Sequence, residues 1–155
     1  MISPELLRLY EFFAGFNHRQ LDDLAMAAEE ASIRADHWFF EEGETLSNFF
    51  LLVEGSVALT HNIPDRNVKQ TTTMQLTGNM ALEPVTIGML GEREVFGWSA
   101  IIPPNRSTAG TQALTDCRVF TFDMEKLRPS LNGNCVFGQL ITMKAAQIIR
   151  ERLRM

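Results

Sequence analysis

The sequence predicts a mainly β fold with helices at both ends. Three observations support this fold class. Residues 32–122 consist of short apolar runs separated by Gly, Pro, Asn and Asp, which is typical of many short strands. The segments on either side carry apolar residues at helical spacing. Gly43 and Gly55 lie twelve residues apart, a spacing that suits two turns of a β-roll or jelly roll.

Two helices are expected at the N-terminus. Ser3 can cap the first, and Pro4 suits its first position. The second is expected over residues 19–30. The apolar positions of both helices recur on one face: Leu6, Leu7, Tyr10 and Phe13 in the first, and Leu21, Leu24, Ala25 and Ala28 in the second.

The central region is expected to contain the strands. Residues 49–53 and 56–60 form the clearest strand pair, joined through Glu54-Gly55. Residues 61–84 are polar and rich in threonine, so we expect an extended hairpin with a solvated tip there, in preference to a binding insertion. Further strands are expected at 85–89, 110–114 and 118–122.

The C-terminal region is predicted to be helical from Met124. Pro129 and Gly133 are expected to interrupt it, because proline lacks a backbone N–H and glycine weakens a helix. A longer helix is expected over 136–152. Its apolar stripe comprises Phe137, Leu140, Ile141, Ala145 and Ile148.

Composition limits the kinds of function. The 155-residue chain is 45% hydrophobic and is the size of one domain. Its 14 Lys and Arg residues against 19 Asp and Glu residues give a net charge of −5, so no overall field attracts nucleic acid or an anionic membrane. The sequence lacks a long apolar run and a signal-peptide pattern, and we expect a cytoplasmic protein without a membrane span.

The residue types that carry catalysis and metal binding form no pattern in this sequence. Cys117 and Cys135 lack metal-ligand spacing, and both are expected to pack in the core. His18, His37 and His61 fall in unrelated segments and are expected at the surface or in turns. Neither a glycine-flanked serine nor a phosphate-binding P-loop motif is present, so we expect no catalytic residue, no metal site and no enzymatic activity.

One segment, residues 95–109, has the features of a phosphate-binding loop. It runs Val95-Phe96-Gly97-Trp98-Ser99-Ala100 and, after Pro103-Pro104-Asn105, continues with Arg106-Ser107-Thr108-Ala109. Glycine permits close approach of the backbone, and the start of a short helix presents amide N–H groups. Arginine adds a fork of donors that suits a phosphate. We call this segment the cassette.

The cassette, the glycine pair and the order of elements together resemble the cyclic nucleotide-binding domain, as found in the catabolite activator protein family. The resemblance covers nearly the whole chain. It implies one domain over residues 1–155 with an eight-stranded β-roll or jelly roll and a short helix in the cassette. In this division the N-terminal helices span 1–31, the β-roll 32–123 and the C-terminal helical region 124–155.

The resemblance also implies roles for the cassette residues. Gly97 matches a glycine at which a side chain would crowd the ligand, and Ser99 and Ala100 follow on the short helix whose amides face a phosphate. Arg106 and Ser107 match the residues that bind the phosphate, and Thr108 begins the next strand. Trp98 stands where the family usually has a glutamate for the ribose 2′-hydroxyl. The expected ligand-binding set is therefore Gly97, Trp98, Ser99, Ala100, Arg106, Ser107 and Thr108.

Trp98 leaves three alternatives open: weak binding of a cyclic nucleotide such as cAMP or cGMP, binding of a different anion that stacks on the indole, or a site filled by its own side chains. The resemblance implies a regulatory ligand-sensing domain that signals through its C-terminal helix. The competing hypothesis is a scaffold or interaction module that has kept the fold and lost the ligand.

The resemblance implies partners as well. In the family the C-terminal helix covers the nucleotide base and often forms a dimer interface, so residues around Arg152 and Leu153 are expected near the ligand and a homodimer through this helix is expected. A separate protein partner, not identified by the sequence, would read the signal. The chain ends at Met155 without a helix-turn-helix segment, so direct DNA binding is not expected.

Overall fold

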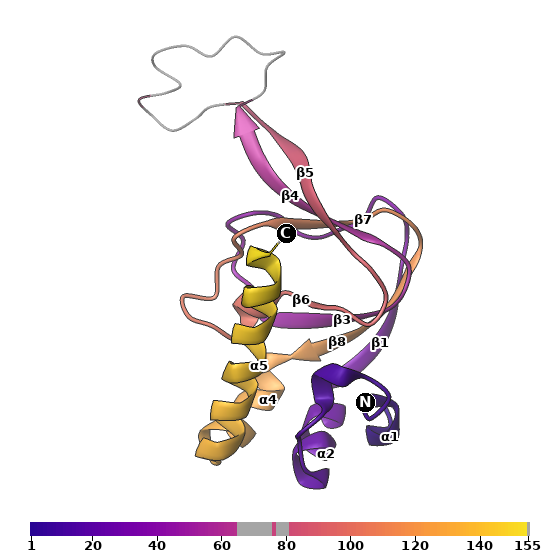
Figure 1. Cartoon of the computed structure of the whole chain (residues 1–155), viewed down its shortest axis with the longest axis vertical. Coiled ribbons are helices and arrows are strands. Elements are labelled where there is room, and N and C mark those ends of the chain that lie inside the picture. Colours follow the sequence, from indigo (N-terminus) through magenta and orange to yellow (C-terminus); the bar gives the residue numbers. More distant parts are fainter. Residues whose placement is uncertain (65–75, 77–80, 155) are drawn as a thin grey trace.

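The protein forms two four-stranded antiparallel sheets packed face to face, with the N-terminal helices at one end and the long C-terminal helix running from that end alongside the sandwich (Figure 1). The computed structural model describes residues 1–64, 76 and 81–154. Most of the expected hairpin over 61–84, including its tip, lies outside the described residues. The mainly β fold class with eight strands and flanking helices is confirmed.

The two sheets have interleaved strand orders. In the first sheet the order is β1-β8-β3-β6, with β1 at Ala28–Ile33, β8 at Cys117–Asp123, β3 at Asn48–Glu54 and β6 at Val95–Phe96. In the second sheet the order is β2-β7-β4-β5, with β2 at Trp38–Phe40, β7 at Gly110–Ala113, β4 at Val57–Pro64 and β5 at Leu82–Leu90.

The expected pairing of residues 49–53 with 56–60 is wrong. These segments form β3 and β4, which lie in different sheets: Phe49 of β3 faces Phe122 of β8, and Leu59 of β4 faces Thr111 of β7. The connection turns at Gly55, where φ is +110° and a Cβ atom would lie 2.6 Å from Cys117 Sγ. Glycine here therefore serves the crossing between sheets and not a hairpin.

The core lies between the sheets and extends beneath the N-terminal helices. Phe49 and Phe122 stack with their ring centroids 4.7 Å apart, and both are fully buried. Phe13 joins them from the N-terminal region at 5.5 Å from Phe122. These aromatic contacts attach the N-terminal helices to the first sheet.

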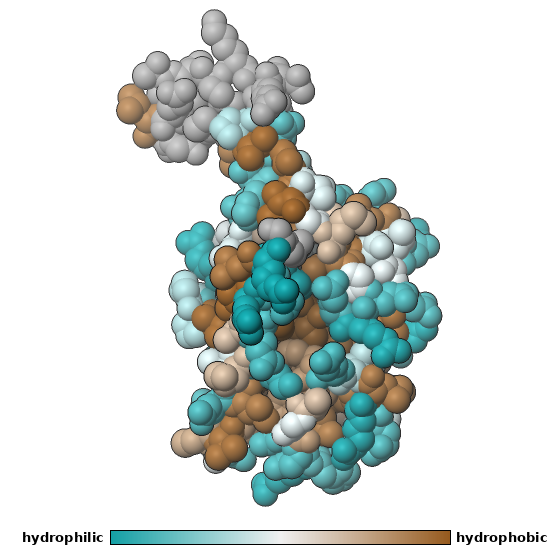
Figure 2. Space-filling model, viewed as in Figure 1, coloured by the Kyte–Doolittle hydropathy of each residue, from teal (hydrophilic) through white to brown (hydrophobic). Residues whose placement is uncertain are grey.

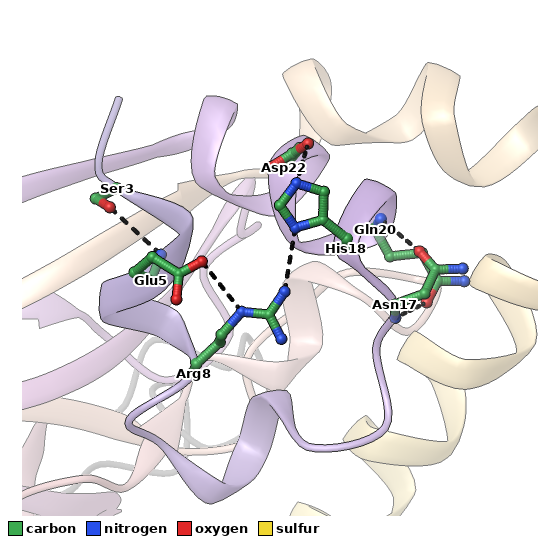
Figure 3. Close-up of polar contacts among 7 residues, drawn as sticks. All are labelled: Ser3, Glu5, Arg8, Asn17, His18, Gln20 and Asp22. Carbon is green, nitrogen blue, oxygen red and sulfur yellow. Dashed lines mark hydrogen bonds and ion pairs between the residues drawn. The ribbon is translucent and has the colours of Figure 1, made fainter.

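The N-terminal helices are shorter than expected. Helix α1 spans Pro4–Leu7, a 3₁₀ turn (η1) spans Glu11–Phe13, and α2 spans His18–Met26. Asn17 caps α2 in a reciprocal arrangement: the Gln20 backbone N–H donates to Asn17 Oδ1 at 2.8 Å, and the Asn17 N–H donates to Gln20 Oε1 at 2.9 Å (Figure 3). This capping box fixes where α2 begins.

Helix α2 ends four residues earlier than residue 30, the expected end, because the chain pairs with a distant strand. Residues 28–33 form β1 against β8, with Ala28 opposite Phe122. Arg118 Nη2 of β8 lies 2.6 Å from Glu30 Oε1 across this pair. Tertiary pairing thus overrides the helical spacing of Ala28.

The C-terminal region contains two helices, α4 at Met124–Asn132 and α5 at Cys135–Leu153. The expected interruption at Pro129 is wrong: α4 continues through it, and the Pro129 carbonyl accepts from the Gly133 N–H at 3.0 Å. The longer helix is confirmed, with Phe137, Ile141 and Ala145 buried. Cys117 is buried as expected, but Cys135 is exposed at the start of α5.

Strands β4 and β5 continue beyond the sandwich as a two-stranded ribbon (Figure 1). Their pairing extends to Pro64 opposite Leu82, and the register shifts between Leu59 and Thr60, so that Ile87 has no partner on β4. Apolar residues gather on the stem of this ribbon (Figure 2). Among the described residues, no helix is both long and apolar enough to cross a membrane.

Candidate functional site

A cavity of about 550 Å³ opens between the cassette, the inner face of the second sheet and the last turns of α5. Figure 1 shows the C-terminal end of α5 beside the sandwich, near the base of the β4–β5 ribbon. The lining residues are Phe40, Leu59, His61, Ile87, Phe96, Gly97, Trp98, Ser99, Ser107, Thr108, Ala109, Thr111, Ile149, Arg152 and Leu153. Five of the seven residues of the expected ligand-binding set are among them: Gly97, Trp98, Ser99, Ser107 and Thr108.

Gly97 forms the turn between β6 and the short 3₁₀ helix η2, which spans Trp98–Ala100. Its φ of +81° is in the left-handed region. A Cβ atom on Gly97 would lie 3.2 Å from Asn48 O and 3.3 Å from Phe49 Cα, both on β3. The glycine is thus required by close packing against β3, whereas the sequence led us to expect crowding of the ligand.

Of the three residues after Gly97, two line the cavity and the third packs in the core. Trp98 is half-buried and Ser99 is buried, and both line the cavity. Ala100 is fully buried in the core and lies outside the lining. Asn105 Nδ2 donates to Ser99 O at 2.9 Å and to Ala100 O at 3.1 Å, which joins the two halves of the cassette.

Arg106 is exposed and lies outside the cavity lining. Its Nε donates to Gly43 O at 3.1 Å, so the side chain lies along the turn that contains the first glycine of the pair. Ser107 is buried; its N–H donates to Glu44 O at 2.8 Å and its Oγ to Glu41 O at 2.6 Å. These hydrogen bonds within the protein fix the cassette loop to the turn at residues 41–44 and require no ligand.

The last turns of α5 contribute Ile149, Arg152 and Leu153 to the cavity. Arg152 Nη2 donates to Val95 O at 2.9 Å, and its Nη1 lies 3.6 Å from Glu94 Oε1. Burial lowers the pKa of the Arg152 guanidinium, and the neighbouring Glu94 carboxylate acts in the opposite direction. Arg152 is thus a mostly buried cation beside the cassette, with a side-chain exposure of 18%.

Two polar residues of the cavity wall were missed by sequence reasoning as site residues. His61 was expected at the surface or in a turn; it is exposed, but it lies on β4 and lines the cavity. Thr111 on β7 is buried and lines the same cavity. Strand alternation is the signal for both, because residues 59 and 61, and residues 109 and 111, share the inner face of the second sheet.

The lining is chiefly apolar and aromatic, with a few hydroxyl groups, one imidazole and one guanidinium. No carboxylate is among the described residues that line it. The part of the chain that the structure describes contains no cluster of three or more His, Cys, Asp or Glu side chains arranged for a metal ion. Such a lining suits an organic ligand that has an apolar body and a few polar or anionic groups.

Comparisons with known proteins agree with this geometry. The sequence model of the family described as "Cyclic nucleotide-binding domain" matches residues 30–134. No curated protein matches the sequence.

Three solved structures show how far the fold is shared. A candidate cyclic nucleotide-binding protein from Geobacter metallireducens GS-15 is 29% identical, with 99% of each chain covered and a TM-score of 0.78. A cyclic nucleotide-binding domain from Methylobacillus flagellatus KT is 17% identical, covering 97% of this chain and 75% of that one, with a TM-score of 0.71. The regulatory domain of Toxoplasma gondii PKA, crystallised with cAMP, is 16% identical, covering 93% of this chain and 48% of that one, with a TM-score of 0.68.

Proposed function

Because the chain belongs to the cyclic nucleotide-binding domain family, a family of regulatory sensory domains, we propose that it binds a cyclic nucleotide or another organic anion in the cavity beside Gly97. One observation carries the proposal: the cassette and the end of α5 line the same cavity of about 550 Å³. That volume is within the range of small-molecule sites. A ligand held there would touch both the cassette and the helix.

The proposed anion contacts come from the cassette. Ser99 and Thr108 line the cavity and supply hydroxyl donors, whereas the hydroxyl of Ser107, which also lines it, already donates to Glu41 O. Arg106 uses Nε for Gly43 O, and its two Nη groups donate to no described residue, so they are available to an anion if the side chain turns inward. A charge-assisted hydrogen bond of this kind contributes about 1.5–3 kcal/mol.

The proposed output is the position of α5. Ile149, Arg152 and Leu153 border the cavity, and Arg152 also bonds to the strand that leads into Gly97. A ligand that contacts these groups differently in two positions of α5 shifts the population between them. We propose that a protein partner, or a second copy of this chain, reads α5. A non-enzymatic role in the cytoplasm is part of the same proposal.

A scaffold that has lost the ligand is the second candidate, and two observations favour it. Trp98 occupies the cavity wall where the family usually supplies a glutamate, and Arg106 is bonded to Gly43 O outside the cavity. In this alternative the fold serves only as a platform for protein contacts.

Thermal unfolding with a panel of anions separates the two candidates. The panel contains cAMP, cGMP, other nucleotides, ribose 5-phosphate and glycerol 2-phosphate. A ligand at a hundred times its Kd stabilises the folded state by about 2.7 kcal/mol. For a domain of this size that raises the Tm by about 5–10 °C. Absence of a shift with every compound would contradict the sensor and favour the scaffold.

Tryptophan fluorescence provides a second measurement with an internal control. The chain has two tryptophans; Trp98 lines the cavity, whereas Trp38 lies on β2 and is not among the lining residues. A ligand in the cavity is expected to change the emission of the Trp38→Phe variant and to leave the emission of the Trp98→Phe variant unchanged. The reverse pattern would place the ligand elsewhere.

A further inference from the structure

The inner face of the second sheet forms one wall of the cavity through Leu59 and His61 on β4, Thr111 on β7, and Ala109 just before β7. We call these four residues the cavity floor. Leu59 lies directly opposite Thr111 in the strand register. His61 is two residues further along β4 on the same face, so His61 and Thr111 are diagonal neighbours. The backbones of such a pair lie about 7–8 Å apart.

Thr111 has an unusual hydrogen-bond status. The residue is 1% exposed, and within the described residues its Oγ1 is the only buried side-chain nitrogen or oxygen atom without a hydrogen-bond partner. Buried hydroxyl groups nearly always have a hydrogen-bond partner, because an unpaired one loses its hydrogen bonds to water and gains no other. Oγ1 itself is buried and does not face the open cavity, so the hydroxyl meets a polar group there only after a turn about the Cα–Cβ bond to another staggered position.

The floor and the cassette are within reach of one ligand. Ser107 and Thr111 both line the cavity and are four residues apart, at most about 13 Å along an extended chain. A single mononucleotide can span that distance. The aromatic side chains of Phe40, Phe96 and Trp98, which also line the cavity, offer apolar surface to a flat ring.

We propose, on the basis of the proposed function, that the ligand is a heteroaromatic anion whose ring carries a hydrogen-bonding edge, and that Thr111 and His61 read this edge at the cavity floor. The cassette holds the anionic end. Thr111 offers one donor and two acceptor positions, and the imidazole of His61 can donate or accept. Both residues therefore determine which ring is preferred, and Arg106 and Ser107 do not.

The variants Thr111→Val and His61→Leu test this assignment, with cAMP, cGMP and the ring-free anion glycerol 2-phosphate as probes. Removing one neutral hydrogen bond is expected to weaken binding of the preferred cyclic nucleotide by about 2- to 12-fold. The ratio of the cAMP and cGMP dissociation constants is expected to change in both variants, because the two bases present different edges.

Matched control variants carry the same substitutions outside the cavity. Thr60→Val removes a hydroxyl from a buried threonine that precedes His61 on β4 but is not among the lining residues. His37→Leu removes an exposed imidazole that is likewise outside the lining. Both controls are expected to bind the two nucleotides with unchanged affinity and an unchanged ratio.

Thermal unfolding without ligand distinguishes recognition from a structural role. Thr111→Val is expected to unfold at the same temperature as the unmodified protein or higher, because it replaces an unpaired buried hydroxyl with an apolar group of the same shape. A lower unfolding temperature together with unchanged affinity would show that Thr111 is structural and would overturn the inference.

The failure of this inference differs from the failure of the proposed function. Binding of cAMP or cGMP with affinities and ratio unchanged in both variants would overturn the floor assignment and leave the sensor intact. Binding of glycerol 2-phosphate with neither nucleotide bound would overturn the heteroaromatic ligand. Absence of binding to any anion would overturn the proposed function and this inference with it.

Discussion

Arg152 Nη2 donates a hydrogen bond to the backbone carbonyl of Val95 across 2.9 Å, and this contact joins the last turn of α5 to β6, the strand with which the cassette begins. The same guanidinium lines the cavity and lies 3.6 Å from Glu94. A ligand that moves the cassette would therefore act directly on α5, the helix whose position is the proposed signal.

Arg152→Ala is expected to lower the free energy of unfolding by about 1–3 kcal/mol, because it leaves the Val95 carbonyl without this donor. Denaturant unfolding measures the loss. Arg150→Ala is the control: this exposed residue lies in the same last turn of α5, and its replacement is expected to change stability by less than about 0.5 kcal/mol. Equal effects of the two variants would contradict the specific role of the Val95 contact.

Arg106→Ala is expected to weaken binding of the anion by about 10- to 150-fold, which corresponds to the loss of a charge-assisted contact. Its effect on stability is expected to be small, because the side chain is exposed. Isothermal titration calorimetry measures the dissociation constant of the anion for this variant and for the control Arg34→Ala. Arg34 is an exposed arginine outside the cavity lining, so its replacement is expected to leave the affinity unchanged. Undiminished binding in Arg106→Ala would show that the anion is held by other groups.

Trp98→Glu is expected to increase the affinity for a cyclic nucleotide by roughly 5- to 150-fold, because a carboxylate can accept a hydrogen bond from the ribose 2′-hydroxyl. The 2′-deoxy analogue of cAMP provides the control, since it lacks that hydroxyl and should gain little. An unchanged affinity would mean that the cavity differs from a typical cyclic nucleotide site at more positions than this one.

Gly97→Ala is expected to destabilise the fold by about 2–4 kcal/mol through two effects, the positive φ and the contact of the new Cβ with β3. Gly15→Ala separates them. Gly15 also has a positive φ, of +92°, but a Cβ atom there meets nothing within 4 Å. Gly15→Ala is therefore expected to lower the free energy of unfolding by only about 1 kcal/mol. Equal losses in chemical denaturation would show that crowding against β3 contributes nothing.

Cys135 is expected to react with an aromatic disulfide reagent in the folded protein, and Cys117 only after unfolding. Cys135 is exposed in the first turn of α5, whereas Cys117 is 3% exposed and its Sγ lies 3.2 Å from Thr115 O. One equivalent of thiol is expected before denaturant and two after it. Cys135→Ser should abolish the first. Two equivalents from the folded protein would contradict the burial of Cys117.

The strands could be recognised from the sequence because apolar runs and turn residues are local signals. Their partners could not: Leu59 pairs with Thr111 and Phe49 with Phe122, at sequence separations that no periodicity encodes. The end of α2 shows the same limit. Ala28 fits the helical spacing, yet it becomes the first residue of β1 because β8 offers it a backbone partner.

The cavity lining could be predicted where it is contiguous in sequence. The cassette is one segment, and five of its seven expected residues line the cavity. Thr111, His61 and Arg152 come from three separate elements, so only the folded chain brings them together. The orientation of Arg106 toward Gly43 O was equally beyond the sequence, since that bond spans 63 residues.

Strand β5 contributes Ile87 to the cavity and is also the outer strand of the second sheet. An outer strand is a template on which another chain can add by hydrogen bonding. Here Pro84 removes one backbone donor from β5, and the register shift near Ile87 breaks the regular row of donors and acceptors. The irregularity at Ile87, on one side of the cavity, therefore also makes β5 a poorer template for an added strand.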